Sequence, residues 1–289
     1  MKVLVLGGGA SGMMAALTAA EDPSNQVTLL ERQSRVGRKL LATGNGRCNL
    51  SNLHADVSHY HGDHPSFVSS ALQFFSVQDT LDFFRQLGLI TVSESDGKVY
   101  PFSDQANSVV DVLRLALTQR GVDVRCGCEV ISISKKARGY SLKTNDEAFY
   151  GDKVIISCGG AAGAKLGGTD LGYRLLSGLG HKMTLISPSL VQIKTQTAYT
   201  KSLKGVRAEA SVTLKRNGAV CARSEGEVQF TDFGISGPAI FSLSREAAAD
   251  GDRLLLLDLL AMMSEDELTA HLTVRKNTVY DLPLEDFLT

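Results

Sequence analysis

The sequence predicts an α/β protein, with a first part built on a buried parallel sheet and a second part rich in β-strands. The chain opens with an apolar run, "KVLVL" (residues 2–6), followed by a glycine cluster and an alanine-rich segment. A second apolar run, "VTLLE" (27–31), follows at the spacing of a strand–helix–strand unit. From about residue 190, alternating polar and apolar residues between polar turns indicate short strands.

The segment "GGGASG" joins the first apolar run to the alanine-rich segment, and its glycines satisfy G-x-G-x-x-G. In this motif the first glycine permits a tight turn, the second lets a pyrophosphate approach the backbone, and the third lets the helix pack closely. The helix N-terminus offers N–H groups and a partial positive charge to phosphates. Glu31 ends the second run, where a carboxylate accepts hydrogen bonds from an adenosine ribose. The unit predicts a dinucleotide site formed by Gly7, Gly9, Ala10, Ser11, Gly12, Glu31 and Arg32.

The segment "GRKLLATGNGRCNLSN" (37–52) is a glycine- and cation-rich loop with no apolar period. It begins six residues after Glu31, where an NAD dehydrogenase usually returns to its sheet, so it favours a longer cofactor such as FAD. Cations at its start can neutralise phosphate, and its glycines and asparagines can approach ribityl hydroxyls or flavin edges. An alternative is a surface loop whose charges contact only water, and composition alone does not separate the two. The candidate residues are Arg38, Lys39, Gly44, Asn45 and Asn49.

Four segments together resemble the BaiN/RdsA-like NAD(P)/FAD-dependent oxidoreductases, which include aminoacetone oxidase-type flavoproteins. They are the loop at 37–52, "GKVYPFSDQANSVVDVL", "GTDLGYRLLSGLGH" and "FTDFGISGPAI", in that order. The resemblance implies a Rossmann-like FAD-binding domain of glutathione-reductase type with a β-rich inserted domain on the substrate side. It also implies that the candidate residues of the glycine turn and the loop line the FAD.

The resemblance further predicts the domain limits. Residues 1–189 are expected to form the FAD-binding domain and residues 190–289 the β-rich insert. Family members continue after the insert with a glycine-rich segment that returns to the flavin, and nothing here matches it. We therefore expect a C-terminally truncated chain whose FAD-binding domain lacks its return segment.

Between these segments, "VDVRCGCEVISIS", "GYSLKT" and "KVIISCGG" predict strands. By analogy with this flavoprotein class, Val130 brings its backbone to the adenine. Gly159 and Gly160 suit a close backbone approach to the cofactor. Neither forms part of a second G-x-G-x-x-G, so NAD(P)H is expected to dock only transiently, as the electron donor.

Helices are predicted where apolar residues recur at helical spacing. "SFVSSALQFFSVQDTLDFFRQL" (66–87) predicts two amphipathic helices split near Ser76, and 107–120 a further helix. Pro238 is expected at a helix start, and Ser264 with Glu267 predicts a capping box. We expect the aromatic stripe of the first pair to lie in the core; it comprises Phe67, Phe74, Phe75, Phe83 and Phe84.

Composition narrows the class of protein. The 289 residues carry a net charge of -1 without a basic run, which argues against a nucleic-acid partner. No segment reaches the ~18 unbroken apolar residues of a membrane helix. The five cysteines are few and irregularly spaced, which indicates reduced thiols in a cytoplasmic protein. Cys48 is interpreted as a packing residue. No metal is expected, because His54, His59, His61 and His64 lack the spacing of a metal site.

The function expected from these observations is a flavin-dependent oxidoreductase. Hydride would pass from NAD(P)H through FAD to a small organic acceptor, with an enone such as an oxo-steroid or bile-acid intermediate as the preferred substrate. A flavin-dependent amine oxidase and a non-catalytic truncated fragment are the alternatives. The catalytic residue is not determined by the sequence, although Tyr100 and Lys98 lie in a family-matching segment and can donate protons. The sequence does not indicate the oligomeric state.

Overall fold

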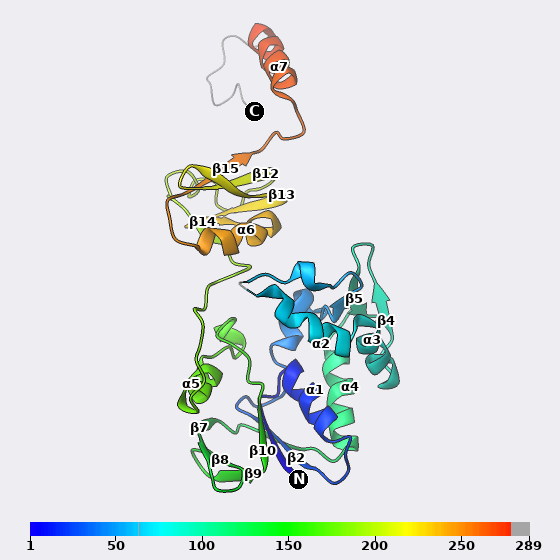
Figure 1. Ribbon diagram of the computed structural model, residues 1–289. Coiled ribbons are helices and arrows are strands. Elements are labelled where there is room, and N and C mark those ends of the chain that lie inside the picture. Colours follow the sequence, from blue (N-terminus) through cyan, green and yellow to red (C-terminus); the bar gives the residue numbers. More distant parts are fainter. Residues whose placement is uncertain (63, 279–289) are drawn as a thin grey trace. The chain divides into compact units, whose positions relative to one another are not determined.

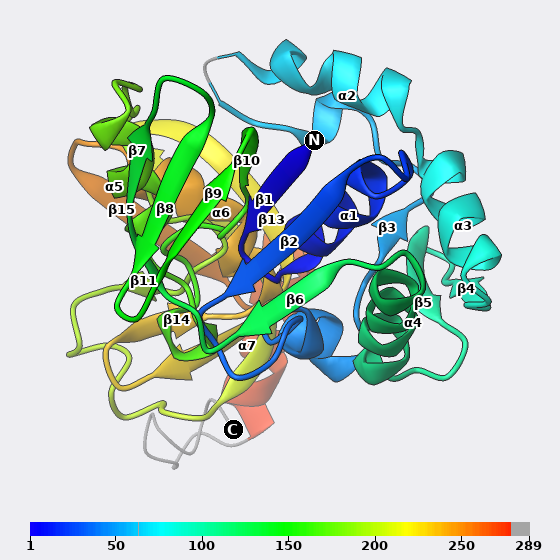
Figure 2. The same cartoon turned by 90° about the horizontal axis from the view of Figure 1, so that it is seen from below.

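A four-stranded parallel sheet organises the first unit of the chain, Met1–Met183 (Figure 2). The computed structural model describes residues 1–62 and 64–278. β1 (Lys2–Leu6) lies between β2 (Gln26–Glu31) and β10 (Lys153–Ile156), and β6 (Asp123–Cys126) pairs with β2. α1 (Ala10–Ala19) connects β1 to β2, so the predicted strand–helix–strand unit is confirmed.

Both faces of this sheet are covered. On one face α1 packs beside α4 (Ala106–Gln119), and their core includes Val3 and Val5 of β1 (Figure 1). On the other face, Leu4 and Leu6 pack against an antiparallel meander and α5 (Leu171–Gly178). Since successive side chains of a strand point to opposite faces, double coverage explains why β1 is apolar and buried from Val3 to Leu6. The meander consists of β7 (Val130–Lys135), β8 (Tyr140–Thr144) and β9 (Ala148–Gly151).

A long excursion separates β2 from α4. It contains the small antiparallel sheet β3 (Ser51–Asn52), β5 (Lys98–Pro101) and β4 (Thr91–Ser93), in that order across the sheet. The 3₁₀ helices η1 (Leu40–Gly46), η2 (Val57–His59) and η3 (Pro65–Val68) precede α2 (Ser69–Phe74) and α3 (Val77–Gln86). Ser76 caps α3 in a reciprocal bond with Asp79, so the predicted split of the two helices is confirmed.

The expected burial of the aromatic stripe is wrong for most of its members. Phe84 is buried and Phe83 packs against the core, but Phe67 is 81% and Phe74 90% exposed. Phe75 is also exposed. α2 has only six residues, none of them buried. Helical periodicity shows which side chains share a face, but not whether another element covers that face.

The second unit, Thr184–Thr289, contains a five-stranded antiparallel sheet. α6 (Pro238–Ala248) packs on one face, with Ile240 and Leu243 against Val212 and Val228. Pro238 occupies the first turn of α6, as predicted. The strand order is β11 (Ile193–Lys194), β14 (Gly234–Ser236), β13 (Ala219–Thr231), β12 (Arg207–Arg216) and β15 (Arg253–Asp258).

The last described helix is α7 (Glu265–Thr278). Ser264 and Glu267 form the predicted capping box before it: the Ser264 hydroxyl accepts from the Glu267 amide, and the Glu267 carboxylate accepts from the Ser264 amide. Within residues 1–62 and 64–278, no helix has the length and apolar character needed to cross a membrane. The predicted domain limits, 1–189 and 190–289, stay a prediction; in the structure the first unit ends at residue 183 and the second begins at residue 184.

The core of the first unit leads to a stability prediction on α4. Leu113 is 1% exposed, whereas Leu115 on the same helix is 57% exposed. Leu113→Ala should lower the free energy of unfolding by about 2–5 kcal/mol, because it leaves a cavity beneath the sheet. Leu115→Ala should change it by no more than about 0.5 kcal/mol. Urea unfolding followed by circular dichroism measures both, and equal effects of the two substitutions would contradict the packing described here.

Candidate functional site

A cavity of about 690 Å³ opens at the carboxyl ends of the parallel strands of the first unit. Its volume lies within the range of small-molecule and cofactor sites. β1 has its neighbours β2 and β10 on opposite sides, and ligands of open α/β sheets bind where such connections diverge. The residues at the strand ends that line it are Leu6, Gly7, Leu30, Glu31, Ser157 and Cys158.

The glycine turn lies at the base of this cavity, and its three motif glycines are required for different reasons. Gly7 has a φ of +109°, and a Cβ there would lie 2.5 Å from the Cα of Cys158. At Gly12 a Cβ would lie 1.7 Å from the carbonyl oxygen of Gly7. At Gly9 a Cβ would meet no atom within 4 Å, so the space in front of it is open. The turn therefore packs tightly at both ends and leaves room at its centre.

α1 begins at that open centre. Gly9 is the N-cap of α1, and no side chain caps the helix. The first N–H groups of a helix have no partner within it, so they are available to an anion in the cavity. Ala10 and Ser11, the first two residues of α1, line the cavity, and the Ser11 hydroxyl donates to the Ser157 carbonyl at 3.4 Å.

Glu31 closes the turn from the β2 side. One carboxylate oxygen accepts from the Gly8 amide at 2.6 Å, and the other accepts from the Gln33 amide at 2.7 Å. These bonds fix the carboxylate at the cavity wall. Each oxygen of an ionised carboxylate can accept a further hydrogen bond, so Glu31 still has capacity for a hydroxyl donor.

Three cations from the segment after β2 are fixed by the loop that follows β10. Arg32 donates to the Gly167 carbonyl at 2.8 Å, Arg38 to the Lys165 carbonyl at 3.2 Å, and Lys39 to the Ala162 carbonyl at 2.8 Å. The loop includes the 3₁₀ helix η4 (Ala164–Leu166). All three cations line the cavity. The alternative in which the charges of the loop contact only water is therefore not what the structure shows for these side chains. Their contact with phosphate stays a prediction.

Most of the residues predicted for the site meet at this cavity. Those that line it are Gly7, Gly9, Ala10, Ser11, Glu31, Arg32, Arg38, Lys39, Asn49, Val130 and Gly159. Those outside its lining are Gly12, Gly44, Asn45, Gly160, Tyr100 and Lys98.

Two glycines outside the lining are required by close packing rather than by the cavity. A Cβ at Gly44 would lie 2.7 Å from the Asn49 amide, and one at Gly160 would lie 2.4 Å from the Tyr173 hydroxyl. Tyr100 is buried, and Lys98 forms an ion pair with Asp96. A catalytic or cofactor contact of these residues stays a prediction.

Sequence reasoning did not identify several side chains of the cavity wall. The signal for Ser157 and Cys158 was present, because they directly follow β10 and the carboxyl ends of parallel strands meet at one edge. Burial raises the pKa of the Cys48 and Cys158 thiols, which favours the uncharged thiol and agrees with a packing role for Cys48. The unpredicted lining residues include Met14, Gln33, Thr43, Phe84 and Thr169.

Across the part of the chain that is described, no three His, Cys, Asp or Glu residues gather to hold a metal ion.

The strand order, the glycine turn and the cavity at the strand ends define a Rossmann-like dinucleotide-binding fold. Residues 1–249 match the family described as the HI0933-like protein Rossmann domain, and the chain belongs to this family. The resemblance drawn from the sequence is thereby confirmed.

Two curated relatives illustrate the range of the family. The chain is 41% identical over 248 residues to the 3-dehydro-bile acid delta(4,6)-reductase of Clostridium scindens, a match covering 86% of this chain and 60% of that protein. It is 29% identical over 243 residues to the ribosomal RNA dihydrouridine synthase of Escherichia coli, covering 83% and 60%. The chain thus spans about 60% of the length of these relatives. We expected from the composition that the chain does not bind nucleic acid. The name of the Escherichia coli relative, which refers to ribosomal RNA, does not support that expectation.

Solved structures resemble the chain more distantly. A flavocytochrome c3 fumarate reductase in its open conformation matches 72% of this chain and 46% of its own length, at 15% identity and a TM-score of 0.46. The family assignment therefore rests on the sequence matches.

The glycine turn yields the second prediction. Gly12→Ala should lower the free energy of unfolding by roughly 3 kcal/mol or more, because its methyl group has no room against the Gly7 carbonyl. Gly9→Ala should lower it by no more than about 1 kcal/mol, since its methyl group meets open space and only the cap preference changes. Thermal unfolding of the two variants measures the difference. A Gly12→Ala protein as stable as Gly9→Ala would show that α1 does not pack on the turn in this way.

Proposed function

We propose that this chain forms the FAD-binding part of a flavin-dependent oxidoreductase. The observation that carries the proposal is the open space at Gly9, into which the uncapped start of α1 points its N–H groups. A pyrophosphate fits both the space and the charge. The fixed carboxylate of Glu31 is suited to the hydroxyls of an adenosine ribose.

The extent of the cavity favours FAD over a smaller nucleotide. From the glycine turn the cavity reaches Thr43, Cys48 and Asn49 in the loop at 37–52. These residues lie beyond what an ADP group on Gly9 and Glu31 would need. Arg38 and Lys39 add positive charge along the wall. When bound, FAD would supply hydride transfer, while the protein supplies orientation and electrostatics.

The names of the relatives suggest the chemistry of the acceptor. A delta(4,6)-reductase of a 3-dehydro-bile acid, by its name, saturates a C=C bond conjugated to a carbonyl. A dihydrouridine synthase, by its name, makes a base in which the C=C bond of uracil, also conjugated to a carbonyl, is saturated. We therefore propose an α,β-unsaturated carbonyl compound as acceptor, with a 3-oxo-steroid of the bile-acid type first because that relative is 41% identical. NAD(P)H is the proposed hydride donor, and no observation favours the amine oxidase alternative.

The third prediction tests this reaction. Protein mixed with FAD and excess NADH or NADPH under anaerobic conditions should oxidise one equivalent of nicotinamide per FAD without an acceptor, and should continue beyond that equivalent only when a 3-oxo-delta(4,6)-steroid is added. The steroid product should be two hydrogen atoms heavier by mass spectrometry. Ribosomal RNA serves as the competing acceptor, and loss of its uridine with no change in the steroid would contradict the proposed acceptor. Failure of the protein to bind FAD would contradict the cofactor itself.

The fourth prediction concerns Glu31. Glu31→Gln should weaken the binding of both FAD and ADP by at least about 1 kcal/mol, roughly fivefold, because a charged acceptor is lost. Binding is followed by isothermal titration. Glu21→Gln is the matched control, since Glu21 is an exposed carboxylate that pairs with Arg120 outside the cavity lining. Equal affinities in wild type and Glu31→Gln would show that Glu31 does not bind the ribose.

A further inference from the structure

The loop at 37–52 contains a run of unusual backbone. Gly44, Asn45, Gly46 and Cys48 have φ values of 55°, 57°, 86° and 62°. The left-handed region is unfavourable for residues with a Cβ, and two of the four are not glycine. A run of this kind persists only where the surrounding structure fixes it.

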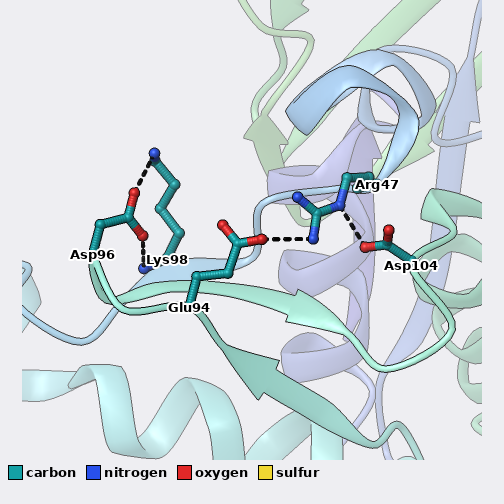
Figure 3. Close-up of polar contacts among 5 residues, drawn as sticks. All are labelled: Arg47, Glu94, Asp96, Lys98 and Asp104. Carbon is teal, nitrogen blue, oxygen red and sulfur yellow. Dashed lines mark hydrogen bonds and ion pairs between the residues drawn. The ribbon is translucent and has the colours of Figure 1, made fainter.

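Arg47 is the one residue in this run with a negative φ, at -92°. Its guanidinium donates from Nη2 to Glu94 at 2.8 Å and from Nε to Asp104 (Figure 3). It also lies 3.9 Å above the centre of the Tyr100 ring. The two carboxylates raise the pKa of the guanidinium, so it stays charged. Glu94 and Asp104 flank the strand β5, which ties the loop to the small sheet.

We call Arg47, Glu94, Asp104 and Tyr100 the Arg47 cluster. Figure 3 also shows a simpler ion pair nearby. Lys98 and Asp96 are two positions apart and pair across one turn, so that contact is local. Arg47, in contrast, joins segments 47 and 57 residues apart in the chain. Cys48 packs in the core of the first unit, and Arg47 adds charged contacts that join the strained run to both ends of β5.

The strained run sits between two parts of the cavity wall. Thr43 lines the cavity before the run, and Cys48 and Asn49 line it at the end. Arg47 itself is outside the lining. The Cys48 amide donates to the Thr43 carbonyl at 3.0 Å, which closes the turn on itself. Loss of the Arg47 contacts would therefore displace Thr43, Cys48 and Asn49, which line the cavity. It would not remove a direct contact to a ligand, because Arg47 does not line the cavity.

We infer that Arg47 is a positioning residue that holds residues 43–49 in the shape required by the flavin half of FAD. The inference rests on the proposed function, since it assumes that the cavity takes FAD. The ADP half is expected at the glycine turn, Glu31 and Val130 rather than at residues 43–49, so ADP binding should not depend on Arg47. This difference separates positioning of the loop from a general loss of stability, which would weaken both ligands.

The test compares Arg47→Gln, Arg47→Lys and a control, Arg85→Gln, in titrations with FAD and ADP. Arg85 pairs with Asp82 on the exposed side of α3 and does not line the cavity. Arg47→Gln should weaken FAD binding about tenfold and leave ADP binding within about twofold. Arg47→Lys should fall between, because lysine keeps the charge but cannot stack or pair with two carboxylates as a planar fork. Arg85→Gln should match the wild type.

Hydrogen exchange of the Cys48 amide gives a second measurement that needs no flavin. It should be faster in Arg47→Gln than in wild type and unchanged in Arg85→Gln. Unchanged FAD affinity in Arg47→Gln, or equal weakening of FAD and ADP, would overturn the inference. Wild-type protein that binds neither ligand would reject the proposed function. The exchange rate would then decide whether Arg47 holds the loop: an unchanged rate overturns that role, and a faster rate supports it.

Discussion

The contact between α1 and the turn before it constrains the rest of the first unit. The Cα of Gly12 lies so close to the Gly7 carbonyl that no side chain fits between them. Because the helix starts against the end of β1, its axis lies over the sheet and buries Met13 and Leu17 on Val3 and Val5. The same closeness turns its unpaired N–H groups toward the carboxyl ends of the strands. One steric requirement thus fixes both the packing of the helix on the sheet and the position of the helix N-terminus at the cavity.

Parts of the cavity lining are held in different ways. Strand ends and buried apolar side chains form part of the lining, and two loops held by cations form another part. Arg32, Arg38 and Lys39 hold the loop after β10 through its carbonyls, and Arg47 holds the loop at 37–52 through two carboxylates. Bonds of partly exposed cations are individually weak compared with burial in a core.

The sequence predicts the parts of this structure that depend on neighbours along the chain. The strand, glycine turn, helix and acidic strand end follow one another within 31 residues, so spacing alone identifies them. The split near Ser76, the helix start at Pro238 and the capping box at Ser264 are equally local.

Features that depend on distant segments escape sequence reasoning. Neither carboxylate that binds Arg47 is marked by any pattern near it, and the exposure of Phe67 and Phe74 depends on what covers α2. The strand β15, "RLLLLD", was not predicted, and its leucines are partly exposed at the sheet edge. The outer strand of a sheet has a partner on one side only, so its residues show a weaker pattern of burial.

The two relatives act, by their names, on molecules of very different size and charge, a bile acid and a ribosomal RNA. Each nevertheless matches more than four fifths of this chain. The two therefore share the matched part, and the described residues of that part form a Rossmann-like fold with a cavity at the strand ends. A shared fold does not fix a substrate, because specificity belongs to particular side chains at the site. On the proposed function, the chain supplies the cofactor and the saturation of a conjugated C=C bond.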